Sequence, residues 1–296
     1  MARPKVALIT GGASGMGLAV AETLSARGDW IVHILDVNKT RGEQVGRDVP
    51  RVFFHQADVT NYGSLSEAFK SAFSHDSCLD FVFANAGIIE RTNFYAPHPT
   101  DENFSAPPEP DLLSIDADLK GVIFTTYLAQ HYFRISSHGR LDASIVMTAS
   151  CGGLYPSFYS PLYSAAKFGV VGFMRSIVHS FGTNGVRVNA ICPGIVRTNL
   201  VDKVGWNSFP QNRFIDQEII SQVVLQLVDG GKQAGQGMTD TKGRYFPASK
   251  LAGLAVEISD EGVYFRDPHE FCDDGMREVM TATVLENQVG GILQQN

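Results

Sequence analysis

The sequence has little of what marks several large classes of protein. Its 296 residues carry a net charge of −7, and they contain no run of basic side chains that would neutralise nucleic-acid phosphates. The four cysteines show no Cys-x-x-Cys pair, and the eight histidines form no metal-ligand spacing. We therefore expect reduced thiols, no metal site, and no DNA or RNA partner.

Long hydrophobic runs are also absent. The first apolar run, Val6 to Ile9, passes into glycines within three residues and is too short for a signal peptide or a membrane span. The content of 44% hydrophobic and 19% charged residues is typical of a globular protein. We predict a cytoplasmic protein without a membrane span. Because neither a repeat nor a compositional boundary divides the chain, residues 1–296 are predicted to form one domain.

Short apolar runs alternate with segments of helical pattern. Strands of this kind, joined by helices, imply right-handed crossovers and a parallel sheet covered on both faces. The predicted fold class is therefore α/β, with a Rossmann-type doubly wound sheet. Strands are expected at 6–10, 30–36, 52–58, 79–84, 143–149, 186–191 and 253–258, and helices at 18–27, 64–73, 111–133, 160–181 and 218–228. Ser160 and Pro161 are expected to start the long fourth helix as its cap and first-turn proline.

Three stretches interrupt this alternation. Residues 94–110 contain five prolines and indicate an extended loop, either a solvated linker or a flap beside the substrate. Residues 199–215 carry apolar side chains without clean periodicity, and we interpret them as a substrate lid, with core packing as the alternative. Residues 230–243 hold five glycines and are expected to be mobile or irregular. The tail after residue 267 carries no recognisable chemistry.

Tyr163 and Lys167 are four residues apart and share one face of the predicted helix. An ammonium beside a phenol favours the phenolate and lowers the tyrosine pKa. Ser150 follows the strand at 143–149, at the sheet edge where ligands of parallel sheets bind, and its hydroxyl can hold a substrate oxygen. A cofactor would then exchange the hydride. The alternative is an ordinary helical spacing without function. Cys151 is interpreted as a small buried residue rather than a nucleophile.

A glycine-rich segment, Thr10 to Gly17, lies between the first strand and the first helix. Glycines there allow a pyrophosphate to approach the free N–H groups of the helix N-terminus. Asp36 ends the second strand, where a carboxylate accepts hydrogen bonds from both ribose hydroxyls and repels a 2′-phosphate. Neither Ala13, Ser14, Val37 nor Asn38 is a compensating cation, so the sequence predicts NAD(H) rather than NADP(H). A simple turn role for Asp36 is the alternative.

Together these motifs resemble the short-chain dehydrogenase/reductase family over about residues 5–200. The motifs that match in order and spacing are Thr10 to Gly17, Asp58-Val59, Asn85-Ala86-Gly87, Ser150, Tyr163-Ser164-Ala165-Ala166-Lys167 and Pro193-Gly194. The resemblance implies that Ser150 orients the substrate oxygen and that Tyr163 is the acid/base. Lys167 would bind the nicotinamide ribose and lower the tyrosine pKa.

The resemblance also implies a cofactor-binding set. Within it, the glycine turn binds the pyrophosphate, Asp58 and Val59 contact the adenine, Asn85 with Gly87 steadies the sheet, and Ile195 with Thr198 holds the carboxamide. The full set is Thr10, Gly11, Ser14, Gly15, Met16, Gly17, Asp36, Asp58, Val59, Asn85, Ala86, Gly87, Tyr163, Lys167, Pro193, Gly194, Ile195 and Thr198. The residues expected to contact the substrate are Gly152, Leu154, Phe158, Leu200, Val204 and Trp206.

One position departs from the family pattern. Before Lys120-Gly121 the family usually has asparagine, which helps to hold a water that links the lysine to solvent, and this chain has Asp118. A carboxylate there favours protonated Lys167. We count Asp118 with the catalytic residues and predict slowed or pH-shifted activity.

Asp36, the late glycine-rich stretch and the segments from Gly253 to Ser259 and from Gly262 to Arg266 together resemble the NAD-linked hydroxyprostaglandin dehydrogenase-like branch. This resemblance implies a bulky lipid, polyketide or terpenoid secondary alcohol that is oxidised to a ketone. The alternatives are a carbonyl reductase running in reverse and a catalytically weak NAD(H)-binding sensor or scaffold. The family usually pairs the helices expected at 111–133 and 160–181, which implies a homodimer or homotetramer.

Overall fold

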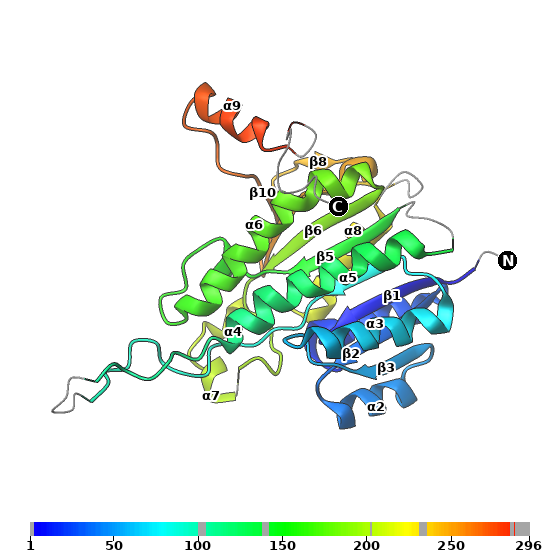
Figure 1. The fold of residues 1–296 in the computed structure, drawn as a ribbon, viewed down its shortest axis with the longest axis horizontal. Coiled ribbons are helices and arrows are strands. Elements are labelled where there is room, and N and C mark those ends of the chain that lie inside the picture. The colour runs from blue at the N-terminus through cyan, green and yellow to red at the C-terminus, as the bar shows by residue number, and fades with distance from the viewer. Residues whose placement is uncertain are drawn as a thin grey trace.

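A computed structural model of the chain describes residues 3–99, 105–137, 142–201, 203–230, 236–284 and 287. Its main sheet has eight strands in the order β10-β9-β6-β5-β4-β1-β2-β3 (Figure 1). Neighbouring strands pair in parallel except for β9 and β10, which are antiparallel. The strands are β1 Lys5–Thr10, β2 Trp30–Asp36, β3 Val52–Gln56, β4 Phe81–Ala84, β5 Ala143–Thr148, β6 Val186–Pro193, β9 Ala255–Ser259 and β10 Gly262–Arg266.

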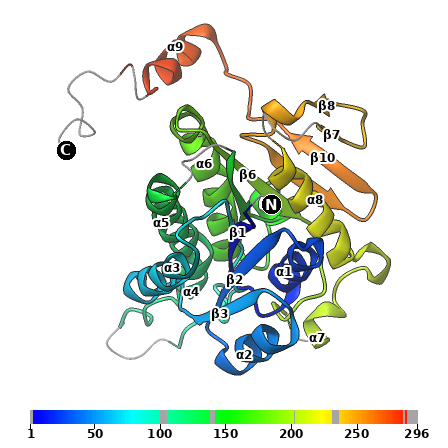
Figure 2. The same cartoon turned by 90° about the vertical axis from the view of Figure 1, so that its right-hand side faces the viewer.

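Helices cover both faces of the sheet (Figure 2). One layer holds α1 Gly15–Arg27, α2 Lys39–Asp48 and α8 Gln217–Asp229, and the other holds α3 Tyr62–Asp76, α5 Gly121–Ile135 and α6 Pro161–Thr183. Alternate strand residues supply the two cores, because Val6 and Leu8 of β1 face one layer while Ala7 and Ile9 face the other. The predicted doubly wound α/β fold is confirmed.

Two elements of the main sheet and its covering helices were not predicted. In α2 only Gly42 and Val45 are buried, so its sequence lacks the apolar periodicity that marks a helix. The edge strand β10 departs from the expected all-parallel sheet, because it returns beside β9 through the tight turn at Asp260 and Glu261. Each element lies at the rim of the fold, where few buried side chains are needed.

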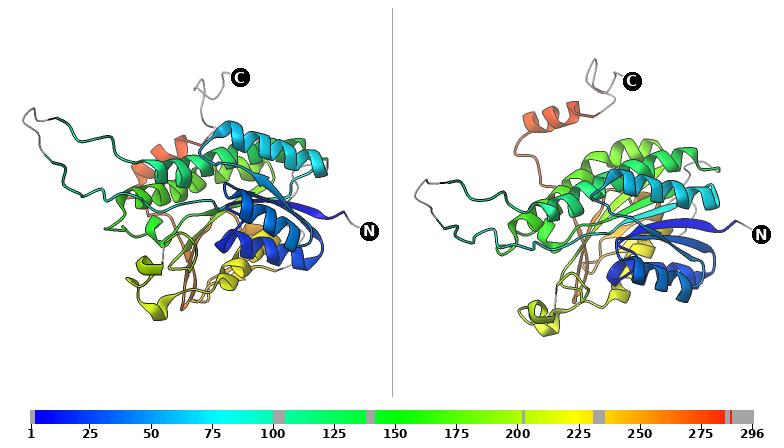
Figure 3. Two further views of the ribbon diagram at one scale, coloured as in Figure 1. Left: turned by 90° about the horizontal axis from the view of Figure 1, so that it is seen from below. Right: turned by 60° about the horizontal axis from the view of Figure 1, so that its bottom comes forward.

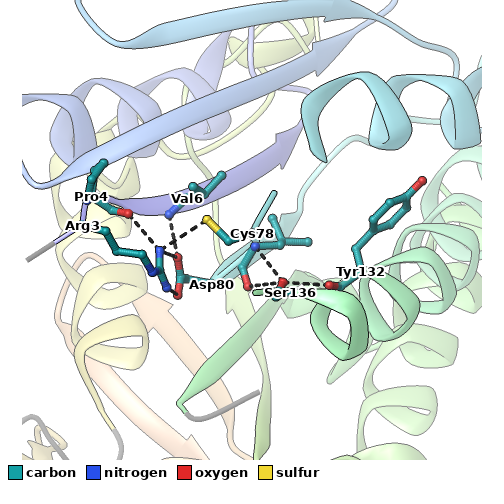
Figure 4. Close-up of polar contacts among 8 residues, drawn as sticks. Arg3, Pro4, Val6, Cys78, Asp80, Tyr132 and Ser136 are labelled. Carbon is teal, nitrogen blue, oxygen red and sulfur yellow. Dashed lines mark hydrogen bonds and ion pairs between the residues drawn. The ribbon is translucent and has the colours of Figure 1, made fainter. Parts of the chain in front are cut away.

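The amino edge of the sheet is closed by a polar network that includes Asp80 (Figure 4). The Asp80 carboxylate accepts hydrogen bonds from the Arg3 guanidinium at 2.7 and 3.0 Å and from the Val6 N–H at 2.8 Å. Beside it, the Ser136 hydroxyl accepts a hydrogen bond from the Leu79 N–H at 3.0 Å. These contacts tie the start of β1 to the segment before β4.

The helix that precedes β5 contains a change of pitch. It begins as α4 Leu113–Ile115, passes through a π-helical turn at Asp116–Lys120, and continues as α5. Smaller elements are 3₁₀ turns at Cys151–Gly153, Gln211–Arg213 and Ala248–Lys250, helix α7 Lys203–Trp206, and the two-stranded β7 Met238–Thr239 with β8 Tyr245–Phe246. Part of the stretch expected to be irregular, 230–243, thus forms a short hairpin strand, while its residues 231–235 lie outside the described residues.

Two segments extend away from the body. Residues 94–99 and 105–110 of the predicted loop have neither helix nor strand and run outward from the sheet edge near α4 (Figures 1 and 3), while residues 100–104 lie outside the described part. The linker and flap interpretations both stay open. Helix α9 Asp274–Ala282 stands apart with every residue exposed. Among the described helices, none is long and apolar enough to cross a membrane.

Candidate active site

The candidate site lies at the carboxyl edge of the parallel strands. From β1 the sheet proceeds through β2 to β3 on one side and through β4 to β5 and β6 on the other. The strand order therefore reverses between β1 and β4. In open α/β sheets, ligands bind in the crevice beyond the strand ends at such a reversal. The glycine turn, Asn85 and Ser150 all follow strands that end there.

The glycine turn requires glycine at several positions. Gly11 and Gly15 have positive φ angles of 65° and 54°, which favour glycine. A Cβ at Gly17 would overlap the Gly11 carbonyl oxygen, and a Cβ at Gly11 would lie 2.9 Å from the Ala86 Cα. The backbone is therefore packed too closely for side chains at these positions, and this packing fixes the shape of the turn before α1.

Thr10 and Asn85 join this turn to the neighbouring strands. The Thr10 hydroxyl accepts hydrogen bonds from the Asn85 N–H at 3.0 Å and the Ala86 N–H at 3.1 Å. The Asn85 amide donates to the Thr10 carbonyl at 3.2 Å and accepts from the Thr148 hydroxyl at 3.0 Å. Asn85 thus links the ends of β1, β4 and β5, which is the sheet-steadying position expected for it.

The N-terminus of α1 faces the same crevice. Ser14 is its N-cap residue, and within the described part of the chain its side chain makes no capping hydrogen bond. First-turn N–H groups beside a glycine turn are ready donors for an anion. Met16 packs against the core from this turn. Pro193 ends β6, and Gly194, Ile195 and Thr198 follow it. Thr198 lies close to Gly15, because a Cβ at Gly15 would be 3.0 Å from the Thr198 Cγ2.

Asp36 is fixed by the backbone around it. Its carboxylate accepts hydrogen bonds from the Ala13 N–H at 3.1 Å and from the Asn38 N–H at 2.9 Å. The Arg41 guanidinium, from α2, donates to the Ala13 carbonyl at 3.3 Å. A cation therefore does lie beside this turn, although it comes from none of the four positions 13, 14, 37 and 38. It was missed because α2 was not predicted, and the first turn of this helix brings Arg41 back to the glycine turn.

The two residues expected at the adenine follow β3. Asp58 is exposed, and its carboxylate accepts hydrogen bonds from the Thr60 N–H at 2.9 Å and the Thr60 hydroxyl at 2.8 Å. The Val59 side chain is buried against α5, where a Cβ at Gly121 would lie 2.9 Å from it. Both residues stand at the same sheet edge as Asp36, and their contact with adenine stays a prediction.

Four polar side chains of the predicted catalytic set come together beyond β5. The Ser150 hydroxyl accepts a hydrogen bond from the Gly152 N–H at 3.0 Å, which orients it. Tyr163 lies in the first turn of α6, and the Lys167 Nζ is 5.4 Å from the centre of its ring. The Lys167 ammonium donates to the Thr148 carbonyl at 2.9 Å and forms an ion pair with Asp118 at 3.1 Å.

Asp118 projects from the π-helical turn into this cluster. It is fully buried, and its carboxylate accepts a hydrogen bond from the Ile88 N–H at 2.8 Å. A Cβ at Gly87 would lie 3.1 Å from a carboxylate oxygen, so glycine makes room for it. Such turns often occur at functional sites. The carboxylate contacts the lysine directly, whereas the family's asparagine is expected to act through water.

The charged groups of this cluster shift one another's pKa values. Burial lowers the pKa of Lys167, but the nearby Asp118 and Tyr163 raise it by more, so the lysine stays protonated. Burial raises the pKa of Tyr163 by more than Lys167 and the Ser150 hydrogen bond lower it, and Asp118 adds to the rise. Lys167 does lower the pKa of Tyr163, but the expected overall lowering of this pKa was wrong, because burial and the Asp118 charge outweigh the ammonium.

The start of α6 is held by a residue that was not predicted. The Glu90 carboxylate accepts a hydrogen bond from the Leu162 N–H at 2.9 Å. The Ser160 side chain makes no cap hydrogen bond to the helix and pairs instead with the Ser157 hydroxyl at 2.7 Å. Ser160 is therefore the N-cap residue, as expected, with Pro161 in the first turn, but its side chain does not make the capping hydrogen bond. Glu90 lies 72 residues from Leu162 in sequence, so no local pattern indicates this contact.

The residues expected at the substrate divide into two groups. Gly152 is buried, and a Cβ there would lie 3.5 Å from the Tyr163 ring, so it borders the acid/base. Leu154 and Leu200 are half-buried, while Phe158 and Val204 are 84% and 75% exposed. Gly152 is thus the member of this set that the structure places at the acid/base, and substrate contact by the others stays a prediction.

The predicted lid is built around Trp206. This side chain is buried, and its Nε1 donates to the Thr198 carbonyl at 3.1 Å. The ring centres of Phe209 and Phe214 lie 5.8 and 5.7 Å from it. Packing within the segment therefore accounts for Trp206, whereas Val204 stays outside. Residue 202 lies outside the described residues.

Comparison with known proteins gives consistent similarities. A family model described as "short chain dehydrogenase" matches residues 5–207. The chain is 65% identical over 280 residues to the short-chain dehydrogenase/reductase prx7 of Penicillium rubens, covering 94% of this chain and 99% of the relative. It is 32% identical over 208 residues to 15-hydroxyprostaglandin dehydrogenase [NAD(+)] of Homo sapiens, covering 68% of this chain and 71% of that protein.

A solved structure shares the fold. It is the 3-ketoacyl-(acyl-carrier-protein) reductase from Brucella melitensis complexed with NADH, with a TM-score of 0.68 and 23% identity. The similarity covers 87% of this chain and 97% of that one.

Proposed function

This chain belongs to the short-chain dehydrogenase/reductase family, whose members act on CH–OH groups, and from this premise we propose that it oxidises the secondary alcohol of a bulky apolar substrate to a ketone with NAD⁺. The observation that carries the proposal is the convergence of Ser150, Tyr163 and Lys167 beside the glycine turn. A hydroxyl held at Ser150 meets an acid/base and a cofactor cradle at the same sheet edge.

The chain's own residues manage the proton. Ser150, oriented by the Gly152 N–H, holds the substrate oxygen, and the phenolate of Tyr163 accepts the hydroxyl proton. Lys167, kept protonated by Asp118, stabilises that phenolate electrostatically. The nicotinamide cofactor supplies the hydride chemistry when it is bound.

The cofactor fits the residues present. The tight glycine turn and the first-turn N–H donors of α1 suit a pyrophosphate. Asp36 would hold the adenine ribose, with Asp58 and Val59 at the adenine. Lys167 would hold the nicotinamide ribose, and Ile195 and Thr198 the carboxamide.

The preference for NAD(H) rests on Asp36, and Arg41 opposes it. The carboxylate is held in place by two N–H groups, so a 2′-phosphate would meet a fixed negative charge. The Arg41 guanidinium lies close enough to reduce that repulsion. We expect NADH to bind the wild type more tightly than NADPH. Arg41→Ala should increase this difference in affinity, and Asp36→Ala should decrease it. Titration of the cofactor fluorescence measures both affinities, and tighter NADPH binding to the wild type would overturn the cofactor assignment.

The apolar nature of the substrate is supported by the segments around the acid/base. Exposed Phe158, Tyr159 and Val204 lie on the loop before α6 and on the lid, and the Tyr159 ring lies 6.4 Å from that of Phe209. A relative named for a hydroxyprostaglandin and for NAD(+) is consistent with such a substrate. A product of secondary metabolism, as a polyketide or terpenoid alcohol, is the class we favour.

Turnover assays test the proposal directly. Purified chain with NAD⁺ should form NADH with hydrophobic secondary alcohols but not with the matched tertiary alcohols, which have no hydrogen on the carbinol carbon. Reduction of the corresponding ketones without measurable oxidation would favour the carbonyl reductase. Tight NADH binding without turnover of any pair would favour the sensor or scaffold.

The oligomeric state remains a prediction from the family. Helices α5 and α6 lie side by side on one face and expose Ile123, Tyr127 and Phe168 (Figures 1 and 2). Light scattering of the purified chain would show whether a dimer or tetramer forms.

A further inference from the structure

Three histidines and an aspartate, far apart in sequence, meet on the α3 side of the sheet edge. His33 lies in the middle of β2, and His55 lies near the end of the neighbouring strand β3. Phe53 is the register partner of His33, and His55 is two residues further, so both strands present these side chains to one face. His75 and Asp76 are the last residues of α3. The topology thus brings together groups that showed no metal-ligand spacing along the chain.

The polar atoms of this cluster converge on one carboxylate oxygen. The Asp76 Oδ2 lies 2.7 Å from the His33 Nε2 and 3.0 Å from the His75 Nδ1. All three ligand atoms lie within 4.8 Å of one another. In a tetrahedral zinc site with bonds of about 2.0–2.1 Å, ligand atoms are roughly 3.3 Å apart. Shifts of a few tenths of an ångström in Asp76 would therefore open room for an ion.

The surroundings also suit a metal. The second nitrogen of His33, Nδ1, lies 2.9 Å from the His55 Nε2, and metal-bound histidines usually have such an outer hydrogen-bond partner. His75 is 46% exposed and leaves a route for the ion and for water ligands.

We propose that His33, His75 and Asp76 bind a divalent first-row transition metal ion, with Zn²⁺ the best match to two imidazoles and a carboxylate, and that His55 orients His33 from outside. The ion would join β2 to the end of α3 and so stabilise the outer edge of the sheet. His33 is three residues from Asp36 along β2, or roughly 10 Å, so the site is separate from the residue proposed to hold the adenine ribose and does not rest on the proposed function.

Zinc titration of the chelator-stripped chain tests this site. We expect calorimetry to give one Zn²⁺ per chain and the melting temperature to rise with Zn²⁺ concentration. His75→Ala and Asp76→Asn should lower the affinity at least tenfold, and His55→Gln by about 10–100-fold as the loss of an outer partner. His98→Ala, which changes an exposed histidine outside the cluster, should leave the affinity unchanged.

Two controls keep the outcome clear. Circular dichroism should show that His75→Ala and Asp76→Asn fold like the wild type, since His75 is half-exposed and an asparagine side chain has nearly the shape of aspartate. Binding of Co²⁺ should give visible bands of nitrogen and oxygen ligands, without thiolate charge transfer from the four cysteines. An absence of Zn²⁺ binding, equal binding by the variants, or a thiolate signature would each overturn the proposal and leave the cluster as a hydrogen-bonded network.

Discussion

The two edges of the main sheet hold ion pairs in opposite environments. At the amino edge, the Arg3 and Asp80 side chains are 38% and 14% exposed and form two short contacts (Figure 4). At the carboxyl edge, the Lys167 and Asp118 side chains are 3% and 0% exposed. Water can replace a lost partner at the first edge but not at the second. The same kind of pair therefore tethers the chain at one edge and sets the charge of an acid/base at the other.

The largest expected difference between the edges is in catalysis. Tyr163→Phe should lower turnover by about 10²–10⁴-fold, because the general acid/base is lost, while NADH affinity stays largely intact. Tyr132→Phe makes the same chemical change at the amino edge and should leave turnover unchanged (Figure 4). Initial rates of NADH formation measure both. Turnover that persists in Tyr163→Phe would remove this residue from the mechanism.

The next difference is in stability. Asp118→Ala leaves the buried Lys167 ammonium without its partner and should lower the free energy of unfolding by about 3–5 kcal/mol. Denaturant titration followed by circular dichroism measures the loss. A loss below about 1 kcal/mol would mean that the buried pair behaves like an exposed one, and the contrast between the edges would fail.

A subtler change is expected in pH dependence. The Asp118 carboxylate raises the pKa of Tyr163, so the neutral amide of Asp118→Asn should lower that pKa. Oxidation needs the phenolate, so the rising limb of kcat/KM against pH should move to lower pH. Rates measured across the pH range with one substrate would show the shift, and an identical profile for both proteins would contradict a charge effect of Asp118.

The smallest effect is expected at the amino edge. Arg3→Ala removes a partly exposed pair and should cost about 0–1 kcal/mol, with turnover unchanged. The loss should shrink further at high salt, because exposed charges are screened. Unfolding curves at low and high salt test this expectation; a loss as large as that of Asp118→Ala would place the two pairs in one class.

The sequence predicted the fold where burial is deep. Strands such as β1 and β5 are buried along nearly their whole length and contain a continuous apolar run, so their pattern is clear. Helix α2 and strand β10 lie at the rim and bury few side chains, so their sequences carry a weak signal. The irregular pitch around Asp118 was also hidden, because a π-helical turn has no distinct apolar period.

At the site, the residues that directly follow strands could be predicted from their position in the sequence. Ser150, Tyr163 and Lys167 meet as expected because strand ends and helix starts share one edge. Arg41, Glu90 and the histidine cluster were missed for a common reason. Each acts across a distance in sequence, through a contact that depends on how helices and strands pack rather than on local spacing.

The π-helical turn at Asp116–Lys120 also fixes the phase of the whole helix that contains it. A π turn accommodates more residues than an α-helical turn, and one residue advances an α-helix by about 100°. Deleting a single residue there would let the hydrogen-bond ladder run regularly from residue 113 to 135. It would also rotate everything before the deletion relative to α5, so Asp118 would no longer point at Lys167. The irregular winding of this helix therefore directs the Asp118 carboxylate toward Lys167.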